Sequence, residues 1–98
     1  MIREVAVLDV RSGDEEAFEA AFAEAKGLIS RADGFHLLSL ERCVEVPNRY
    51  LLLVEWETLE AHTEGFRGSA DYQRWRELLH HFYDPFPTVE HYEVVTTA

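Results

Sequence analysis

Two runs of consecutive apolar residues, 5–8 (Val-Ala-Val-Leu) and 51–54 (Leu-Leu-Leu-Val), constrain the fold of this chain more than any other feature. Both runs are short and rich in β-branched or aliphatic residues without helical spacing, which is typical of strands. Side chains alternate between the two faces of a strand, so an unbroken apolar run puts apolar groups on both faces. We therefore expect a sheet that buries both of its faces.

The rest of the pattern predicts the order strand, helix, strand, strand, helix, strand. Strands are expected over residues 2–10, 35–46, 49–57 and 88–96. The second and third form a hairpin that is broken at Pro47-Asn48. This order matches the split βαβ arrangement of ferredoxin-like folds, an α+β class with a four-stranded antiparallel sheet. We expect a single domain over residues 1–98.

A capping signal and an apolar stripe predict the first helix. Ser12 followed by Glu15 has the form of a capping box at its start. Gly34 is placed to take the left-handed conformation that closes a helix, so we expect the end near Ala32. The stripe that faces the sheet consists of Phe18, Phe22, Ala25 and Ile29.

The second helix is predicted in two pieces. Thr58 can cap a short piece and Ser69 a longer one, with Gly65 and Gly68 interrupting the helix between them. The sequence 84–87 (Asp-Pro-Phe-Pro) ends the second piece, because proline cannot continue a helix. Helical spacing places Leu59, His62 and Phe66 on one side of the first piece, and Tyr72, Trp75, Leu79 and Phe82 on one side of the second.

Charge and length exclude several classes of function. Nine Lys and Arg against nineteen Asp and Glu give a net charge of -10, which would repel nucleic acids and anionic membrane surfaces. No apolar run approaches the roughly 18 residues that span a bilayer, and no export signal is visible. Cys43 is the only cysteine, which fits a reducing compartment and a structural role. We expect a cytoplasmic protein that binds neither nucleic acid nor membrane.

Two helices can cover only one face of the expected sheet. The other face would expose more apolar surface than soluble monomers usually tolerate. An isologous two-fold pair is the commonest solution, so we expect a homodimer with its two sheets packed face to face. Trp56, at the end of its strand, is assigned to this interface in preference to a pocket mouth.

Three segments resemble the antibiotic biosynthesis monooxygenase superfamily: 49–56 (RYLLLVEW), 59–62 (LEAH) and 66–72 (FRGSADY). They are similar to the family's strand, its W-x(4–5)-A-(F/H)-x-x-H helix and its S-x-x-(F/Y) segment. The resemblance implies a dimeric α/β barrel with a pocket between the sheet and the split helix of each protomer. It also implies that His62, Phe66, Tyr72 and Trp75 line this pocket.

The same superfamily covers several activities. It includes cofactor-independent monooxygenases of phenolic, anthrone or quinol-type compounds, haem-degrading enzymes, autoinducer-handling proteins and members with no known reaction. The haem-degrading branch resembles a pattern of Asn in strand one, Trp in the split helix and His about ten positions later. Here residues 2–10 contain no Asn, Phe66 stands at the Trp position and Arg76 follows ten residues later. Haem degradation is therefore not expected, although His80 or His81 could supply a ligand if the helix were shifted.

The leading hypothesis is a cofactor-independent monooxygenase acting on a small aromatic or quinol-type compound. His62 would be the base, because imidazole titrates near neutral pH, and Tyr72 would hold a substrate oxygen. Trp75 would stack on the ring, while Phe66 and Phe82 would contact substrate by shape alone. The alternative is a non-catalytic small-molecule-binding or interaction module, since an inward histidine and aromatic residues at helical spacing are often core residues.

No metal or cofactor is expected. His80 and His81 are adjacent and project about 100° apart around a helix, so they cannot easily share a site, even with Asp84 or His91 as a third ligand. The chain has no H-x-x-x-H or paired-cysteine spacing, no glycine-rich phosphate loop and no G-x-S-x-G motif. Zinc, nucleotide-dependent and serine-hydrolase chemistry are therefore not expected.

Overall fold

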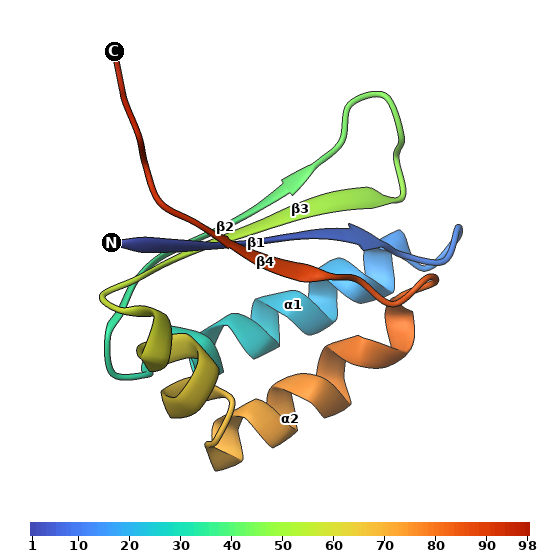
Figure 1. Ribbon diagram of the computed structural model, residues 1–98. Coiled ribbons are helices and arrows are strands. Elements are labelled where there is room, and N and C mark those ends of the chain that lie inside the picture. The colour runs from blue at the N-terminus through green and yellow to red at the C-terminus, as the bar shows by residue number, and fades with distance from the viewer.

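A computed structural model describes residues 1–98 as one antiparallel sheet with helices on one side (Figure 1). The strands are β1 (Ile2–Asp9), β2 (Phe35–Arg42), β3 (Arg49–Trp56) and β4 (Val89–Tyr92), in the spatial order β2-β3-β1-β4. The helical elements are α1 (Glu15–Ser30), the π-helix η1 (Ala61–Phe66), α2 (Ala70–Leu79) and the 3-10 turn η2 (His80–Phe82). This is the ferredoxin-like α+β fold with a split second helix that the sequence predicts.

Alternation along the two central strands decides what enters the core. The buried residues of β1 are Glu4, Ala6 and Leu8, and those of β3 are Tyr50, Leu52, Val54 and Trp56. The predicted stripe of α1, which consists of Phe18, Phe22, Ala25 and Ile29, is buried in the same cluster. Figure 1 shows α1 and α2 below this face of the sheet. Every second residue of β1 and β3 therefore packs between the sheet and the helices.

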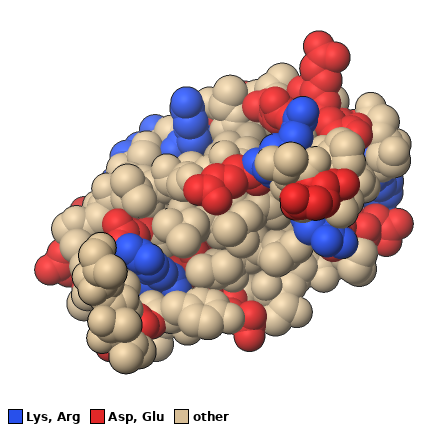
Figure 2. Space-filling view, turned by 90° about the horizontal axis from the view of Figure 1, so that it is seen from above, with Lys and Arg blue, Asp and Glu red and all other residues tan.

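The opposite face of the sheet has no helix over it (Figure 1). It carries the other members of the two apolar runs, namely Val5, Val7, Leu51 and Leu53. Figure 2 looks onto this face and shows uncharged surface running between acidic and basic groups. About half of the surface of Val7, Leu37 and Tyr92 is exposed on this face. The two-faced apolar sheet expected from the sequence is present.

The start of α1 differs from the predicted capping box. The helix begins at Glu15 with Asp14 at its N-cap, and no side chain caps it. The Glu15 carboxylate instead accepts a hydrogen bond from the backbone N–H of Gly13, whose φ is 99°. The prediction of Ser12 as the cap is therefore wrong, because the turn at Gly13 separates it from the helix. Glu15 still lies where the helix dipole favours an acidic group.

The caps of the second helix agree with the prediction. Thr58 Oγ1 accepts a hydrogen bond from the N–H of Ala61, and Ser69 Oγ accepts one from the N–H of Tyr72. The short first piece winds as a π-helix rather than an α-helix. It ends in a turn where the N–H of Gly68 donates to the carbonyl oxygen of Glu64. π-Helical turns occur often at functional sites.

Two strands are shorter than predicted. β2 ends at Arg42, and the loop that follows leaves Val44 91% exposed. β4 ends at Tyr92, which pairs with Arg3, because β1 has almost no residues left beyond that point to pair with. Residues 93–98 therefore continue without a strand partner. None of the helices combines the length and the apolar composition that a membrane-spanning helix requires.

Gly34 fixes the approach of η1 to the turn before β2. Its φ is 83°, and a Cβ added there would lie 2.7 Å from the Cβ of Ala61. We predict that Gly34→Ala lowers the free energy of unfolding by about 1–3 kcal/mol, because both the backbone conformation and the contact disfavour a side chain. Urea denaturation measures this change.

Gly27→Ala is the matched control for that prediction. Gly27 lies within α1, and an added Cβ there would meet no atom within 4 Å. Alanine should raise the free energy of unfolding by up to about 1 kcal/mol through helix propensity. Equal effects of the two substitutions would contradict the steric role of Gly34.

Candidate functional site

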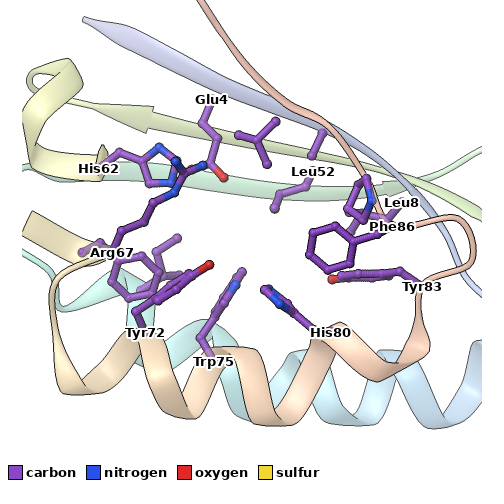
Figure 3. A pocket seen from close by; sticks show the side chains of 15 residues that line it. Glu4, Leu8, Leu52, His62, Arg67, Tyr72, Trp75, His80, Tyr83 and Phe86 are labelled. Atoms are coloured by element: carbon purple, nitrogen blue, oxygen red, sulfur yellow. The ribbon is translucent and has the colours of Figure 1, made fainter. Parts of the chain in front are cut away.

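A cavity of about 250 Å³ lies between the helix-covered face of the sheet and the split second helix. The strands contribute Glu4, Ala6, Leu8, Leu52 and Val89; the helices and the segments after them contribute Ile29, His62, Phe66, Arg67, Tyr72, Trp75, His80, Tyr83, Phe86 and Pro87. Figure 3 shows Glu4, His62 and Arg67 together at one end, with Leu8 and Phe86 at the other. The cavity is therefore apolar along most of its length and polar at one end.

Tyr72, Trp75 and His80 project into the cavity from the α2 side (Figure 3). The Tyr72 hydroxyl points into the open space, and Tyr83 points its hydroxyl inward from the apolar end. Tyr72 also packs edge-on against Phe66, with ring centroids 5.5 Å apart. Flat aromatic walls with inward hydroxyl groups suit a small ring-containing ligand.

His62 is held at the polar end by contacts on three sides. It is 3% exposed and its ring stacks on Trp56, with centroids 5.3 Å apart and an interplanar angle of 15°. Nδ1 lies 2.8 Å from Nε2 of His91, within hydrogen-bond distance. Nε2 lies 3.3 Å from Oε1 of Glu4. Both ring nitrogens of His62 therefore have a polar neighbour in the protein.

Glu4 is the buried acidic group of the site. It is 5% exposed, because strand alternation turns it inward in line with Ala6 and Leu8. Its Oε1 accepts a hydrogen bond of 3.0 Å from the indole N–H of Trp56. Figure 3 shows the carboxylate directed toward the cavity, and no protein group hydrogen-bonds to Oε2. Glu4 therefore presents one free carboxylate oxygen to a ligand.

Burial controls the protonation of this cluster. Burial lowers the pKa of His62 to about 3, helped by the positive charge of Arg67 and by His91. Burial also raises the pKa of Glu4, although the hydrogen bond from Trp56 and the charge of Arg67 oppose this effect. The pKa of His91 is lowered by burial and by Arg67. His62 is therefore neutral at pH 7, and it donates through one nitrogen and accepts through the other.

The structure brings four of the five predicted site residues to the cavity. His62, Phe66, Tyr72 and Trp75 line it, and all but Tyr72 are buried. Phe82 does not line it. Its ring instead packs against Phe18, with centroids 5.6 Å apart.

The prediction for Phe82 failed because the helix changes its winding. α2 ends at Leu79, and the chain continues as the tighter turn η2. A 3-10 turn rotates successive side chains by a larger angle than an α-helix does. Side chains three residues apart eclipse in such a turn, so Phe82 follows the buried Leu79 into the core, while His80 faces the cavity.

Trp56 also lies elsewhere than predicted. It is fully buried on the helix-covered face, where it contacts Glu4 and His62. The assignment of Trp56 to a dimer interface is therefore wrong. Its strand partner Ile2 and the buried Val54 two residues earlier share the same inward alternation.

Sequence reasoning missed Glu4, Arg67 and His91 as members of the site. A signal existed for Glu4, because it shares the alternation of Ala6 and Leu8 in an otherwise apolar strand. His91 has no such signal, since its place follows from the pairing of β4 with β1, which sets it opposite Glu4. Arg67 lies outside the apolar stripe, and only the turn after η1 brings it to the cavity.

The polar side chains of the cavity do not form a metal-binding group. No group of three or more His, Cys, Asp or Glu side chains is arranged to hold a metal ion. His81 is exposed, while His80 faces the cavity alone among aromatic rings. What the arrangement can do is bind a flat ligand and exchange a proton with it at Glu4.

Comparison with known proteins assigns the family. The sequence profile for the antibiotic biosynthesis monooxygenases matches residues 1–78. The chain belongs to this family. Among its relatives, the uncharacterized protein YczJ of Bacillus subtilis is 57% identical over 95 residues, which cover 97% of this chain and 100% of YczJ.

Solved structures of the antibiotic biosynthesis monooxygenase family share the fold. A Bordetella bronchiseptica protein assigned to the family is 43% identical, with a TM-score of 0.91 and 97% of each chain covered. SnoaB, a cofactor-independent oxygenase from Streptomyces nogalater, superposes with a TM-score of 0.79 at 21% identity, over 98% of this chain and 94% of SnoaB. The second likeness is one of fold alone.

The neutral state of His62 has a measurable consequence. We predict that its ring resonances in an NMR titration show no protonation between pH 8 and pH 5, because the folded pKa is about 3. The unfolded chain takes up this proton near pH 6.5. The stability that His62 contributes is therefore complete above about pH 6.5 and is lost as the pH falls toward 3.

Between pH 7 and pH 5 this loss should amount to on the order of 2 kcal/mol of unfolding free energy. Urea denaturation of the parent and of His62→Gln at both pH values checks the size, since the variant lacks this contribution. A titration midpoint of His62 above pH 6 would show that the ring is not buried in neutral form.

Proposed function

We propose that this protein is a cofactor-independent monooxygenase that oxidises a small aromatic or quinol-type compound with dioxygen. The observation that carries the proposal is a buried carboxylate, Glu4, held by Trp56 and His62 at the polar end of an apolar cavity. Membership of the antibiotic biosynthesis monooxygenase family supports the same reaction class. The fold shared with SnoaB, a cofactor-independent oxygenase, is consistent with it.

In such a reaction the substrate supplies the electrons. Removal of a proton leaves an electron-rich anion that reduces dioxygen, and the two combine to a peroxide. Loss of water from the peroxide then converts the ring CH₂ group of the substrate's keto tautomer into a carbonyl, so that CH₂ and O₂ become C=O and H₂O. The protein has to accept the proton, hold the substrate and keep bulk water out.

The Glu4–His62 pair is assigned to the proton transfer. His62 has both nitrogens next to polar partners, whereas Oε2 of Glu4 has no protein partner. Glu4 therefore takes the proton, and His62 orients the carboxylate. The raised pKa of Glu4 makes it a better proton acceptor than an exposed glutamate.

The aromatic residues hold the substrate in this proposal. The Tyr72 hydroxyl hydrogen-bonds a phenolic or quinone oxygen, and Trp75 stacks on the ring. Phe66 shapes the wall behind Tyr72, against which it packs. Phe82 takes no part, because its ring packs in the core against Phe18 of α1.

Oxygen uptake with a panel of quinols and hydroxylated aromatic compounds tests the proposal. We predict that Glu4→Gln lowers kcat by about 10²–10⁴-fold, because it removes the proton acceptor and keeps the shape of the side chain. His62→Ala should also lower kcat. Glu24→Gln is the control, since Glu24 is an exposed carboxylate that pairs with Arg74 outside the cavity.

One result would contradict the role of Glu4, and another would contradict the enzyme proposal itself. Unchanged oxygen uptake in Glu4→Gln would show that Glu4 is not the proton acceptor. Tight binding of an aromatic compound without any oxygen uptake would favour the alternative, a non-catalytic small-molecule-binding module of the same fold.

The uncovered face of the sheet supports a homodimer. Val5, Val7, Leu51 and Leu53 form its apolar centre, and the ion pair between Arg3 and Glu55 lies on the same face. A second copy that packs its own sheet there would bury these groups against the same set. Such an isologous pair leaves the cavity of each protomer on the opposite side of its sheet.

We predict that Val7→Glu converts the protein to monomer at micromolar concentration, because each two-fold contact would bury two new carboxylates. Sedimentation velocity measures the change. Leu59→Glu adds the same charge on the helix side, where Leu59 is 39% exposed, and should leave the dimer intact. A parent protein that sediments as a monomer would refute the proposed dimer.

A further inference from the structure

Arg67 is the one arginine of this chain whose side chain has no polar partner in the protein. Carboxylates pair with Arg3, Arg31, Arg42, Arg49 and Arg74; a backbone carbonyl accepts from Arg11, and the Gln73 amide oxygen from Arg76. The chain has nineteen acidic residues against nine basic ones. An unpaired guanidinium in so acidic a protein is therefore unexpected.

This side chain is directed into the cavity. Arg67 follows η1 directly and lines the cavity beside Glu4 and His62 (Figure 3). The positive charge of Arg67 acts on all three titratable groups of the cluster, since it lowers the pKa of Glu4, His62 and His91. Glu4 nevertheless makes its hydrogen bond with Trp56 rather than with Arg67. The guanidinium thus lies at the polar end with its donors unused.

A guanidinium has five N–H donors in a planar arrangement and stays protonated in proteins. It matches the geometry of a carboxylate or another anionic oxygen, with which it forms strong charge-assisted hydrogen bonds. Neutral His62 and His91 carry no charge that could do this. Arg67 is therefore the group of the cavity that can neutralise an anion.

The volume of the cavity limits the rest of the ligand. A cavity of about 150 Å³ lined by apolar side chains is enough to bind benzene. The cavity here measures about 250 Å³ and is lined at its far end by Leu8, Tyr83 and Phe86. This space suits one aromatic ring with substituents or two fused rings, and it is small for three or four fused rings.

We propose that Arg67 recognises the ligand through an anionic oxygen, so that the cavity takes a one- or two-ring aromatic compound bearing a carboxylate or a phenolate. This inference rests on the proposed function and names the substrate class of the same cavity. When the proton moves from the substrate to Oε2 of Glu4, the carboxylate loses its charge and the substrate anion pairs with Arg67. The net charge of the site stays constant through that step.

Binding measured without oxygen separates this inference from the reaction. The probes are 2-naphthoate, its neutral amide 2-naphthamide, and 2-naphthol, followed by the fluorescence of the tryptophans at the cavity. We expect 2-naphthoate to bind more tightly than 2-naphthamide if the ligand is a carboxylate. If the ligand is a phenolate, bound 2-naphthol should show the absorbance of its ionised form.

Variants assign the effect to Arg67. Arg67→Gln should weaken 2-naphthoate by about 10–100-fold and abolish the ionisation of bound 2-naphthol, with less than about threefold change for 2-naphthamide. The affinity of Arg67→Lys for 2-naphthoate should lie between those of the parent and of Arg67→Gln, because a lysine keeps the charge and loses the planar donors. Arg74→Gln removes one charge outside the cavity and should leave all three probes unchanged. Glu4→Gln should bind 2-naphthoate at least as well as the parent, because it removes the nearest negative charge.

Three outcomes would overturn the inference. The first is equal weakening of 2-naphthoate and 2-naphthamide by Arg67→Gln, which would make the role of Arg67 steric. The second is a parent that neither prefers 2-naphthoate nor ionises 2-naphthol. The third is that Arg67→Gln sediments as a monomer while its ligand binding stays intact. This result would mean that Arg67 contacts a second copy of the chain. Charge-selective binding without oxygen uptake would refute the monooxygenase proposal and leave the anion site standing.

Discussion

The carboxylate of Glu4 accepts a hydrogen bond from the indole of Trp56 in the interior, where an unpaired charge would be costly. This bond joins the two central strands on their covered face, and the imidazole of His62 stacks on the same indole. Removing Glu4 would leave the buried indole N–H of Trp56 without its hydrogen-bond acceptor. The polar end of the cavity therefore depends on one buried arrangement that links β1, β3 and η1.

The two central strands serve two surfaces at once. Their inward residues line the cavity and the core, and their outward residues form the apolar face proposed for dimerisation. Because successive side chains point in opposite directions, neighbouring positions such as Ala6 and Val7 belong to different surfaces. Substitutions on one face can therefore be used to test that face with little effect on the other.

Departures from regular α-helix shape the site. The π-helix η1 places His62 and Phe66 toward the sheet and is followed directly by Arg67. On the other side, the 3-10 turn η2 carries His80, which lines the cavity, and Phe82, which does not. Gly34 allows η1 to approach closely enough for the stack of His62 on Trp56. The irregular elements η1 and η2 therefore supply His62, Phe66 and His80 to the cavity, beside Tyr72 and Trp75 from the regular part of α2.

The sequence by itself determined the order of elements, the one-sided coverage of the sheet and the caps at Thr58 and Ser69. These features follow from periodicity and local hydrogen bonding, which involve residues close together in the chain. The resemblance to the family correctly led to a cavity lined by His62, Phe66, Tyr72 and Trp75. Their roles in chemistry remain proposals.

Only the tertiary structure decided the rest of the site. His91 meets His62 because β4 pairs with β1 in a register that no local pattern specifies. Phe82 lies in the core because the winding changes after Leu79, whereas the inward direction of Trp56 already follows from the alternation along β3. That Arg67 has no polar partner can be seen only in the folded chain, where the partners of the other arginines are known. Interactions between distant segments fix such details, since their energies depend on packing and burial that a local sequence pattern does not contain.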